Sequence, residues 1–138
     1  MDITVHTLCY NEEKLLPFFL DYYSRFASKI TVWDNCSTDA SASIANSFKK
    51  TKVEIQRFNT NNEFREDMNV HIKNNCWKGE KSDFVIICDV DEFVHAVDIA
   101  DFLVRRSEFH VFRPVGYNMV SENFPEYGPR LITEQIKS

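Results

Sequence analysis

The sequence predicts a single α/β domain with a mostly parallel central sheet flanked by helices. Its 138 residues leave room for one hydrophobic core. With 43% hydrophobic and 27% charged residues, the composition is that of an ordinary globular protein. Short strand-like segments alternate with amphipathic helical segments along the chain, and this alternation is typical of parallel strands joined by right-handed helical crossovers.

Hydrophobic periodicity defines each element. Alternating or short apolar runs predict strands, and apolar residues spaced three and four apart predict helices. The predicted strands are 3–9, 29–33, 53–58, 84–88 and 109–113. The predicted helices run from an Asn11 cap to about 26, and over 40–48, 63–78 and 99–106. Pro17 is expected in the first turn of its helix, and the continuously apolar 84–88 is expected to be covered on both faces.

Charge and composition exclude several classes of function. The chain carries 16 Lys and Arg against 21 Asp and Glu, a net charge of −5 that argues against binding nucleic acid or an anionic membrane. Three glycines are too few for a Gly-rich phosphate loop. No apolar run approaches the roughly 20 residues of a membrane span, and no targeting signal precedes the first strand. We therefore expect a cytoplasmic protein without a membrane span. The four cysteines are expected to be buried free thiols, with a zinc site or a disulfide framework as the alternatives.

The pair Asp89 and Asp91 directly follows the predicted strand 84–88. Ligands of parallel sheets bind outside the carboxyl ends of the strands, where the strand order reverses. Residues two apart on an extended segment project to one side, about 6.6–7 Å apart, so both carboxylates can serve one Mg²⁺ or Mn²⁺. The alternative is that one Asp caps the next loop while the other is solvated.

Polar clusters also follow the first two strands. Tyr10, Asn11 and Glu12 follow the first strand, and Asp34 and Asn35 follow the second. Carboxylate and amide groups can bind the polar edge of a nucleobase, and the Tyr10 ring offers a stacking surface. Helix capping and turn formation explain these residue types equally well.

Three motifs together resemble a known family. Residues 7–12 (TLCYNE), 32–39 (VWDNCSTD) and 85–93 (VIICDVDEF) are similar, in this order, to the nucleotide-binding half of a family-2-like GT-A glycosyltransferase with its DxD motif. The resemblance covers about residues 3–95. It implies one Rossmann-like GT-A domain over 1–138, with a nucleotide-binding half at about 1–95 and the start of an acceptor half over 96–138.

The resemblance also implies roles for residues. The segment matched by Tyr10, Asn11 and Glu12 would line the nucleoside pocket, and Asp34 would contact the base, commonly uracil. Asp89 and Asp91 would bind ribose and the metal-bound diphosphate and serve as the catalytic pair. The implied substrate-binding set is Leu8, Tyr10, Asn11, Glu12, Asp34, Asn35, Arg65, Asp67, Lys73, Asn74, Asp89 and Val90.

The predicted helix 63–78 contributes the charged members of that set. Lys73 and Asn74 fall where the family often has Arg-Asn facing the donor, although a lysine cannot reproduce the planar fork of an arginine. Arg65, Asp67 and Lys73 share a helix face that could offer a cation to phosphate and a carboxylate to sugar hydroxyls. An exposed charged helix face is the alternative.

The function implied is transfer of a sugar from a nucleotide-sugar donor, most simply a UDP-sugar, to a hydroxyl of a glycan or glycoprotein acceptor. An inverting route would need a base, for which Glu122, Glu126 and Glu134 are candidates by position only, and a retaining route is equally open. Only 47 residues follow Asp91, fewer than such enzymes need, so we expect a fragment of a longer transferase.

Two other functions remain open. A non-catalytic nucleotide-sugar-binding domain would explain the short second half. A haloacid-dehalogenase-like phosphohydrolase also has an apolar strand ending in Asp-x-Asp, with the first Asp as nucleophile, but Phe93 stands where that family usually has Thr or Val.

Overall fold

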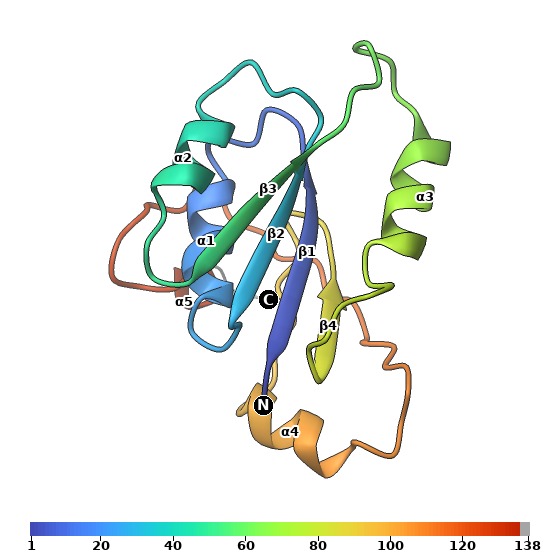
Figure 1. The fold of residues 1–138 in the computed structure, drawn as a ribbon. Helices are drawn as coiled ribbons and strands as arrows, with labels where there is room; N and C mark the ends of the chain where they lie inside the picture. Colours follow the sequence, from blue (N-terminus) through green and yellow to red (C-terminus); the bar gives the residue numbers. More distant parts are fainter. Residues whose placement is uncertain (136–138) are drawn as a thin grey trace.

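Four parallel strands form the centre of the fold in the computed structural model, which describes residues 1–135 (Figure 1). The strands are β1 (Ile3–Cys9), β2 (Lys29–Asp34), β3 (Lys52–Arg57) and β4 (Phe84–Ile87). Their order across the sheet is β3-β2-β1-β4. The helices are α1 (Leu16–Tyr23), α2 (Ser41–Ser47), α3 (Glu66–Asn75), α4 (Ile99–Arg105) and α5 (Ile132–Gln135). The predicted fold class, a parallel sheet flanked by helices, is confirmed.

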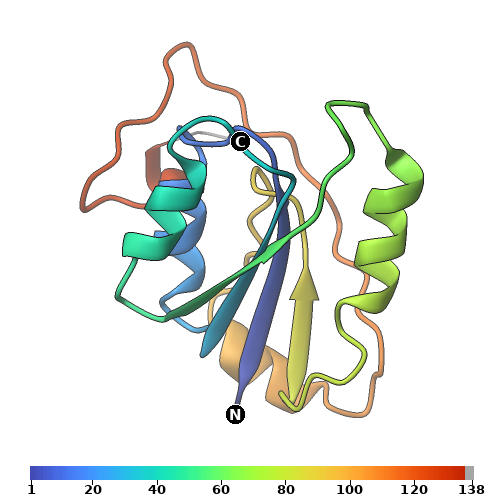
Figure 2. The ribbon, with the colours of Figure 1, turned by 45° about the horizontal axis from the view of Figure 1, so that its top comes forward.

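The core lies between the sheet and α1. The register aligns Val5 with Ile30 and Ile30 with Val53, so these side chains point to the same face. Phe19 and Leu20 of α1 are fully buried against that face. Figures 1 and 2 show α1 and α2 on one side of the sheet and α3 on the other. None of the helices within residues 1–135 is long and apolar enough to cross a bilayer.

The start of α1 differs from the prediction. The helix begins at Leu16, after a turn in which the amides of Leu15 and Leu16 donate to the Glu12 carbonyl. Asn11 does not cap it, because Asn11 adopts a left-handed conformation (φ 55°) and its side chain binds another loop. Pro17 does lie in the first turn, where its missing N–H costs no intrahelical bond.

Three further predictions of buried surface were wrong, wholly or in part. Of the four free cysteines expected to be buried, Cys9 and Cys88 are buried, but Cys36 is exposed and Cys76 is half-buried. All four residues of β4 are only partly buried, because β4 is an edge strand that pairs with β1 alone. The helix predicted over 63–78 is shorter, and of its expected apolar stripe only Ile72 is buried, while Met68 and Cys76 are half-buried. Phe64, which was to begin that stripe, precedes α3 and is 85% exposed.

The strand predicted over 109–113 does not form, although its residues alternate as a strand would. A strand needs a partner as well as a pattern, and within residues 1–135 no strand pairs with this segment. Aromatic contacts hold it instead, since Phe112 packs against Phe102 and Phe109 at centroid distances of 5.9 and 6.3 Å. Val111 remains 84% exposed. The expected start of an acceptor half, 96–138, therefore contains only α4 and α5 as regular structure up to residue 135.

Candidate functional site at the carboxyl edge of the sheet

The segments after β1, β2 and β4 meet at one edge of the sheet. Because β1 pairs with β2 on one side and β4 on the other, the strand order reverses at β1 and β4. Parallel sheets of this kind bind ligands at such a reversal. The three polar clusters that the sequence singled out all follow these strands.

Asn11 joins the loop after β1 to the loop after β2. Its Oδ1 accepts hydrogen bonds from the amides of Thr38 (2.8 Å) and Asp39 (3.3 Å). Its own amide donates to the Ser37 hydroxyl at 3.0 Å. The side chain that the resemblance places in the nucleoside pocket is thus used to fasten two loops together.

Serine and carboxylate groups continue this network toward α2. Ser41, which is buried, accepts a hydrogen bond from the Glu12 amide at 2.8 Å. Asp39 accepts from the amide of Glu13 at 3.0 Å, and Glu13 in turn accepts from the amide of Ala40 at 3.1 Å. The sequence analysis gave Ser41 no role, and an interior serine at the start of an apolar helix was the available signal.

Asp34 and Asn35 form contacts within the loops. Asp34 is 2% exposed, and its Oδ1 accepts from the amide of Ser37 at 3.2 Å. The Asn35 amide group donates to the Thr60 hydroxyl at 2.9 Å and accepts from the Thr60 amide at 3.0 Å. These are the turn contacts that the sequence analysis left open as the alternative to base recognition.

Tyr10 presents its ring at the same edge. The side chain is 44% exposed, and its hydroxyl donates to the Asn62 side chain at 3.2 Å. This bond links the tip of the ring to the loop that follows β3. Leu8, two residues earlier in β1, is partly buried beneath the edge.

The Asp89–Glu92 turn follows β4. Val90 is buried, while Asp89 is partly exposed and Asp91 is exposed. The extended segment expected for the two aspartates is instead a turn, closed by the Glu92 amide, which donates to the Asp89 carbonyl at 3.0 Å. The Asp89 amide donates to the Glu92 carboxylate at 3.0 Å. Within residues 1–135 the Asp91 carboxylate has no hydrogen bond or ion pair, so it is available to a ligand.

Lys73 of α3 lies beside this turn. Its Nζ is 2.6 Å from Oδ1 of Asp89, so the lysine has a protein partner in the turn. Asn74 is exposed at the next position of the helix. Asp89 and Asp91 are therefore not an unopposed pair of acids, because one of them already has a cationic neighbour.

Arg65 and Asp67 bind each other at the start of α3. The guanidinium donates from Nε and Nη2 to the two carboxylate oxygens at 2.9 and 2.7 Å. These hydrogen bonds lower the pKa of Asp67 to about 2. Of the three charged residues predicted to face the donor, Lys73 is the one whose ion pair lies at the strand-end turn.

The charge of Asp91 acts on the carboxyl group of Glu12. Burial raises the pKa of the Glu12 carboxyl above its usual value, and the negative charges of Asp91 and Asp39 raise it further. Acids from the β1 and β4 loops thus concentrate negative charge at the reversal of strand order. A cation or a ligand-bound cation would relieve this repulsion.

The donor set fits a hard divalent cation that shares its coordination with a ligand. Within residues 1–135 no group of three or more His, Cys, Asp or Glu is gathered to hold a metal. Mg²⁺ commonly uses one or two carboxylates and completes its octahedron with phosphate oxygens and water. Asp89 and Asp91 can supply that pair of oxygen ligands, provided that Lys73 releases Asp89.

Comparison with known proteins adds no family. Neither a scan against models of protein families nor a search of curated proteins found a match. The resemblance to GT-A glycosyltransferases is carried by the three motifs alone.

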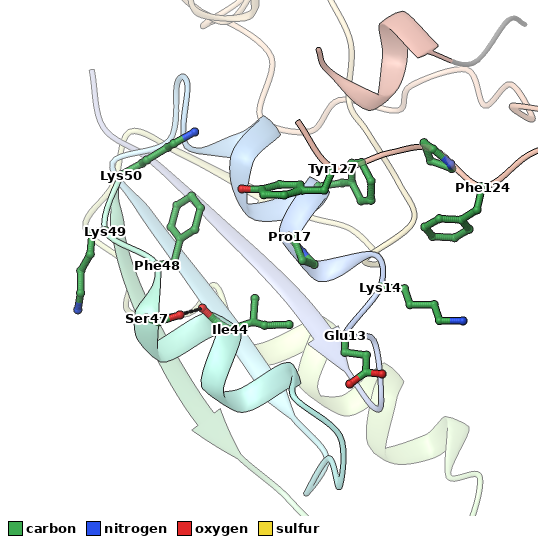
Figure 3. Close-up of a pocket in the computed structure, with 12 residues that line it drawn as sticks. Glu13, Lys14, Pro17, Ile44, Ser47, Phe48, Lys49, Lys50, Phe124 and Tyr127 are labelled. Carbon is green, nitrogen blue, oxygen red and sulfur yellow. Dashed lines mark hydrogen bonds between the residues drawn. The ribbon is translucent and has the colours of Figure 1, made fainter. Parts of the chain in front are cut away.

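A groove outside this edge lies on the face of the sheet that α1 and α2 cover. It has a volume of about 760 Å³ and runs between α1, α2 and the segment 124–127 (Figure 3). Phe18 forms part of its wall and packs edge-on against Phe124 and Tyr127 at centroid distances of 6.2 and 5.6 Å. None of the predicted site residues lines this groove, so the candidate site stays with the strand ends, where the polar groups converge.

Proposed function

We propose that the chain binds a nucleoside-diphosphate sugar at the carboxyl edge of β1 and β4, together with Mn²⁺ or Mg²⁺. It would transfer the sugar to a hydroxyl of a glycan or glycoprotein acceptor. The observation that carries this proposal is that the neighbouring strands β1 and β4 bring Glu12, Asp89 and Asp91 to one edge of the sheet, where the Asp91 carboxylate has no protein partner among residues 1–135. Burial, and after it the charge of Asp91, raises the pKa of Glu12. Such a concentration of carboxylates at the strand-order reversal favours a cation, and Mg²⁺ or Mn²⁺ bound there would complete its coordination with phosphate oxygens.

Different residues would bind the cation, the phosphates and the base. Asp89 and Asp91 would hold the cation, which offsets the charge that develops on the leaving diphosphate. Lys73, once it releases Asp89, is close enough to pair with a phosphate oxygen. The exposed ring of Tyr10 offers a stacking surface for the base.

Asp34 has an indirect role in this proposal. Since its carboxylate is buried and binds the Ser37 amide, it shapes the loop that faces the base. Base preference then comes from the backbone and exposed side chains of that loop. Uridine remains the base that the resemblance implies, and a cytoplasmic location also remains a prediction.

Calorimetry tests the binding step. We expect UDP to bind the chain with Mn²⁺ and to bind at least about tenfold more weakly without it. Asp91→Asn should remove that metal dependence, whereas Asp101→Asn, an exposed aspartate paired with Arg105 on α4, should leave it unchanged. Equal UDP affinity with and without Mn²⁺, or an unchanged Asp91→Asn variant, would contradict the proposal.

Turnover separates transfer from binding alone. Release of sugar from a UDP-sugar, or its transfer to an added glycan, would support the enzyme. Metal-dependent UDP binding with no release would instead identify a nucleotide-sugar-binding domain. Phosphate release from simple phosphate esters, with no preference for uridine, would identify the phosphohydrolase.

A further inference from the structure

The hydroxyl of Tyr23 binds the main chain around the Asp89–Glu92 turn. Tyr23 is the last residue of α1 and is fully buried. Its hydroxyl donates to the carbonyl of Glu92 and accepts from the amide of Val94, both at 3.0 Å. The Sγ of Cys88, directly before the turn, is 3.3 Å from the same oxygen. One side chain therefore contacts the chain on both sides of the two aspartates.

Two neighbouring aromatic residues reinforce this contact. The Tyr22 hydroxyl donates to the carbonyl of Val94 at 3.0 Å. Phe93 packs edge-on against Tyr22 at 5.2 Å and lies nearly parallel to Tyr23 at 6.5 Å between centroids. Phe93 is the residue that departs from the phosphohydrolase pattern, and here it anchors the turn to α1.

The turn belongs to a segment without regular secondary structure. Between the end of β4 and the start of α4, residues 88–98 form no helix or strand. Their backbone bonds include one from Cys88 to the His6 carbonyl and one from Glu92 to the Asp89 carbonyl. Burial raises the pKa of the Tyr23 hydroxyl, so it keeps its proton and remains a donor to Glu92. A buried hydroxyl of this kind fixes the groups that it binds, since leaving them unpaired is costly.

We propose that Tyr23 is a positioning residue, whose hydroxyl fixes the Asp89–Glu92 turn and so sets where Asp91 stands relative to Glu12. Tyr23 touches no ligand in this role and acts through the backbone of Glu92 and Val94. The inference rests on the proposed function, because the placement of Asp91 matters only if the turn binds a cation and diphosphate.

Tyr23→Phe tests the inference, since it keeps the ring and removes only the hydroxyl. We expect hydrogen exchange of the Val94 amide to become about tenfold faster, because its acceptor is lost. We also expect UDP affinity in the presence of Mn²⁺ to fall about tenfold. Tyr22→Phe loses one hydrogen bond to the Val94 carbonyl and leaves Tyr23 intact, so it should change the Val94 exchange rate and the UDP affinity by a smaller factor. It replaces Tyr23→Phe in the test if that variant does not fold.

Thr51→Val is the matched control. Its hydroxyl donates to the carbonyls of Ala27 and Ser28, on the far side of the fold from the strand ends. We expect it to lower the melting temperature without changing UDP affinity or the exchange of Val94. A Tyr23→Phe variant that binds UDP as the wild type does would overturn the inference, as would unchanged exchange at Val94. Failure of the wild type to bind UDP with Mn²⁺ would instead refute the proposed function, and with it the functional part of the inference, whatever the exchange shows.

Discussion

The loop after β2 and the turn after β4 use polar side chains in opposite ways. After β2, the polar groups of Asp34, Ser37 and Asp39 are bound to backbone amides of their own and neighbouring loops. After β4, the main chain is held from beneath by Tyr23, while the carboxylate of Asp91 points out without a partner among residues 1–135.

This difference separates polar groups that stabilise the fold from polar groups that are free to bind a ligand. Both segments are rich in Asp and follow a strand, so their residue types alone do not tell them apart. Carboxylates and amides that bind main-chain amides act as structural caps, and substitution there should change stability. Substitution of a carboxylate that is exposed to solvent near other acids should change ligand binding and have little effect on stability.

The largest stability effect is expected on the scaffold side, at Ser41. Its buried hydroxyl accepts from the Glu12 amide, so Ser41→Ala should lower the free energy of unfolding by about 1–3 kcal/mol in urea denaturation. Ser43→Ala, on the exposed face of the same helix, should change it by less than about 0.5 kcal/mol. If both substitutions lower the free energy of unfolding by the same amount, the hydrogen bond of Ser41 to the Glu12 amide does not stabilise the fold as described.

Substitution of Lys73 tests the turn after β4 as a ligand-binding segment. Removing its ammonium with Lys73→Met should raise the affinity for Mn²⁺ alone by up to about tenfold, because Asp89 loses a competing cation. The same variant should bind UDP with Mn²⁺ more weakly, because a phosphate partner is lost. Lys78→Met, an exposed lysine near Trp77, is the control for charge. Calorimetric changes of the same sign for Mn²⁺ and UDP would contradict the two roles given to Lys73.

The smallest effect is expected at Glu12. Its pKa is raised in the folded protein, so folding is favoured while Glu12 is protonated and is penalised as pH rises through that raised pKa. Glu12→Gln should therefore stabilise the fold at pH 7 by no more than about 1 kcal/mol and have almost no effect below about pH 4. Urea denaturation at both pH values measures this. Stabilisation that is the same at both would exclude the burial of the charged carboxylate and its repulsion by Asp91 and Asp39 as the cause.

Local patterns in the sequence predicted most of the fold and only part of the site. Period-two alternation located β1, whose pairing on both sides then follows from its central place in the sheet. The same alternation failed at 109–113, because no partner strand lies beside that segment within residues 1–135.

The site shows the same division. Placing Asp91 after a strand was a local inference, and it was correct, whereas Asp34 is the last residue of β2 and not the first after it. Which of the two carboxylates is buried depends on the sheet order, because β2 is an inner strand and β4 is an edge strand. Tyr23 was predicted only as an apolar position of its helix, since the Glu92 and Val94 backbone groups that it binds lie about seventy residues away in sequence.

Paramagnetic broadening by Mn²⁺ in an NMR spectrum tests the location of the site most directly. In the presence of UDP, substoichiometric Mn²⁺ should broaden the amide signals of Glu12 and of residues 89–92 first, and leave those of α4 sharp. Broadening that begins at Asp101 on α4, or that spreads evenly over the surface acids, would contradict a cation site at the ends of β1 and β4.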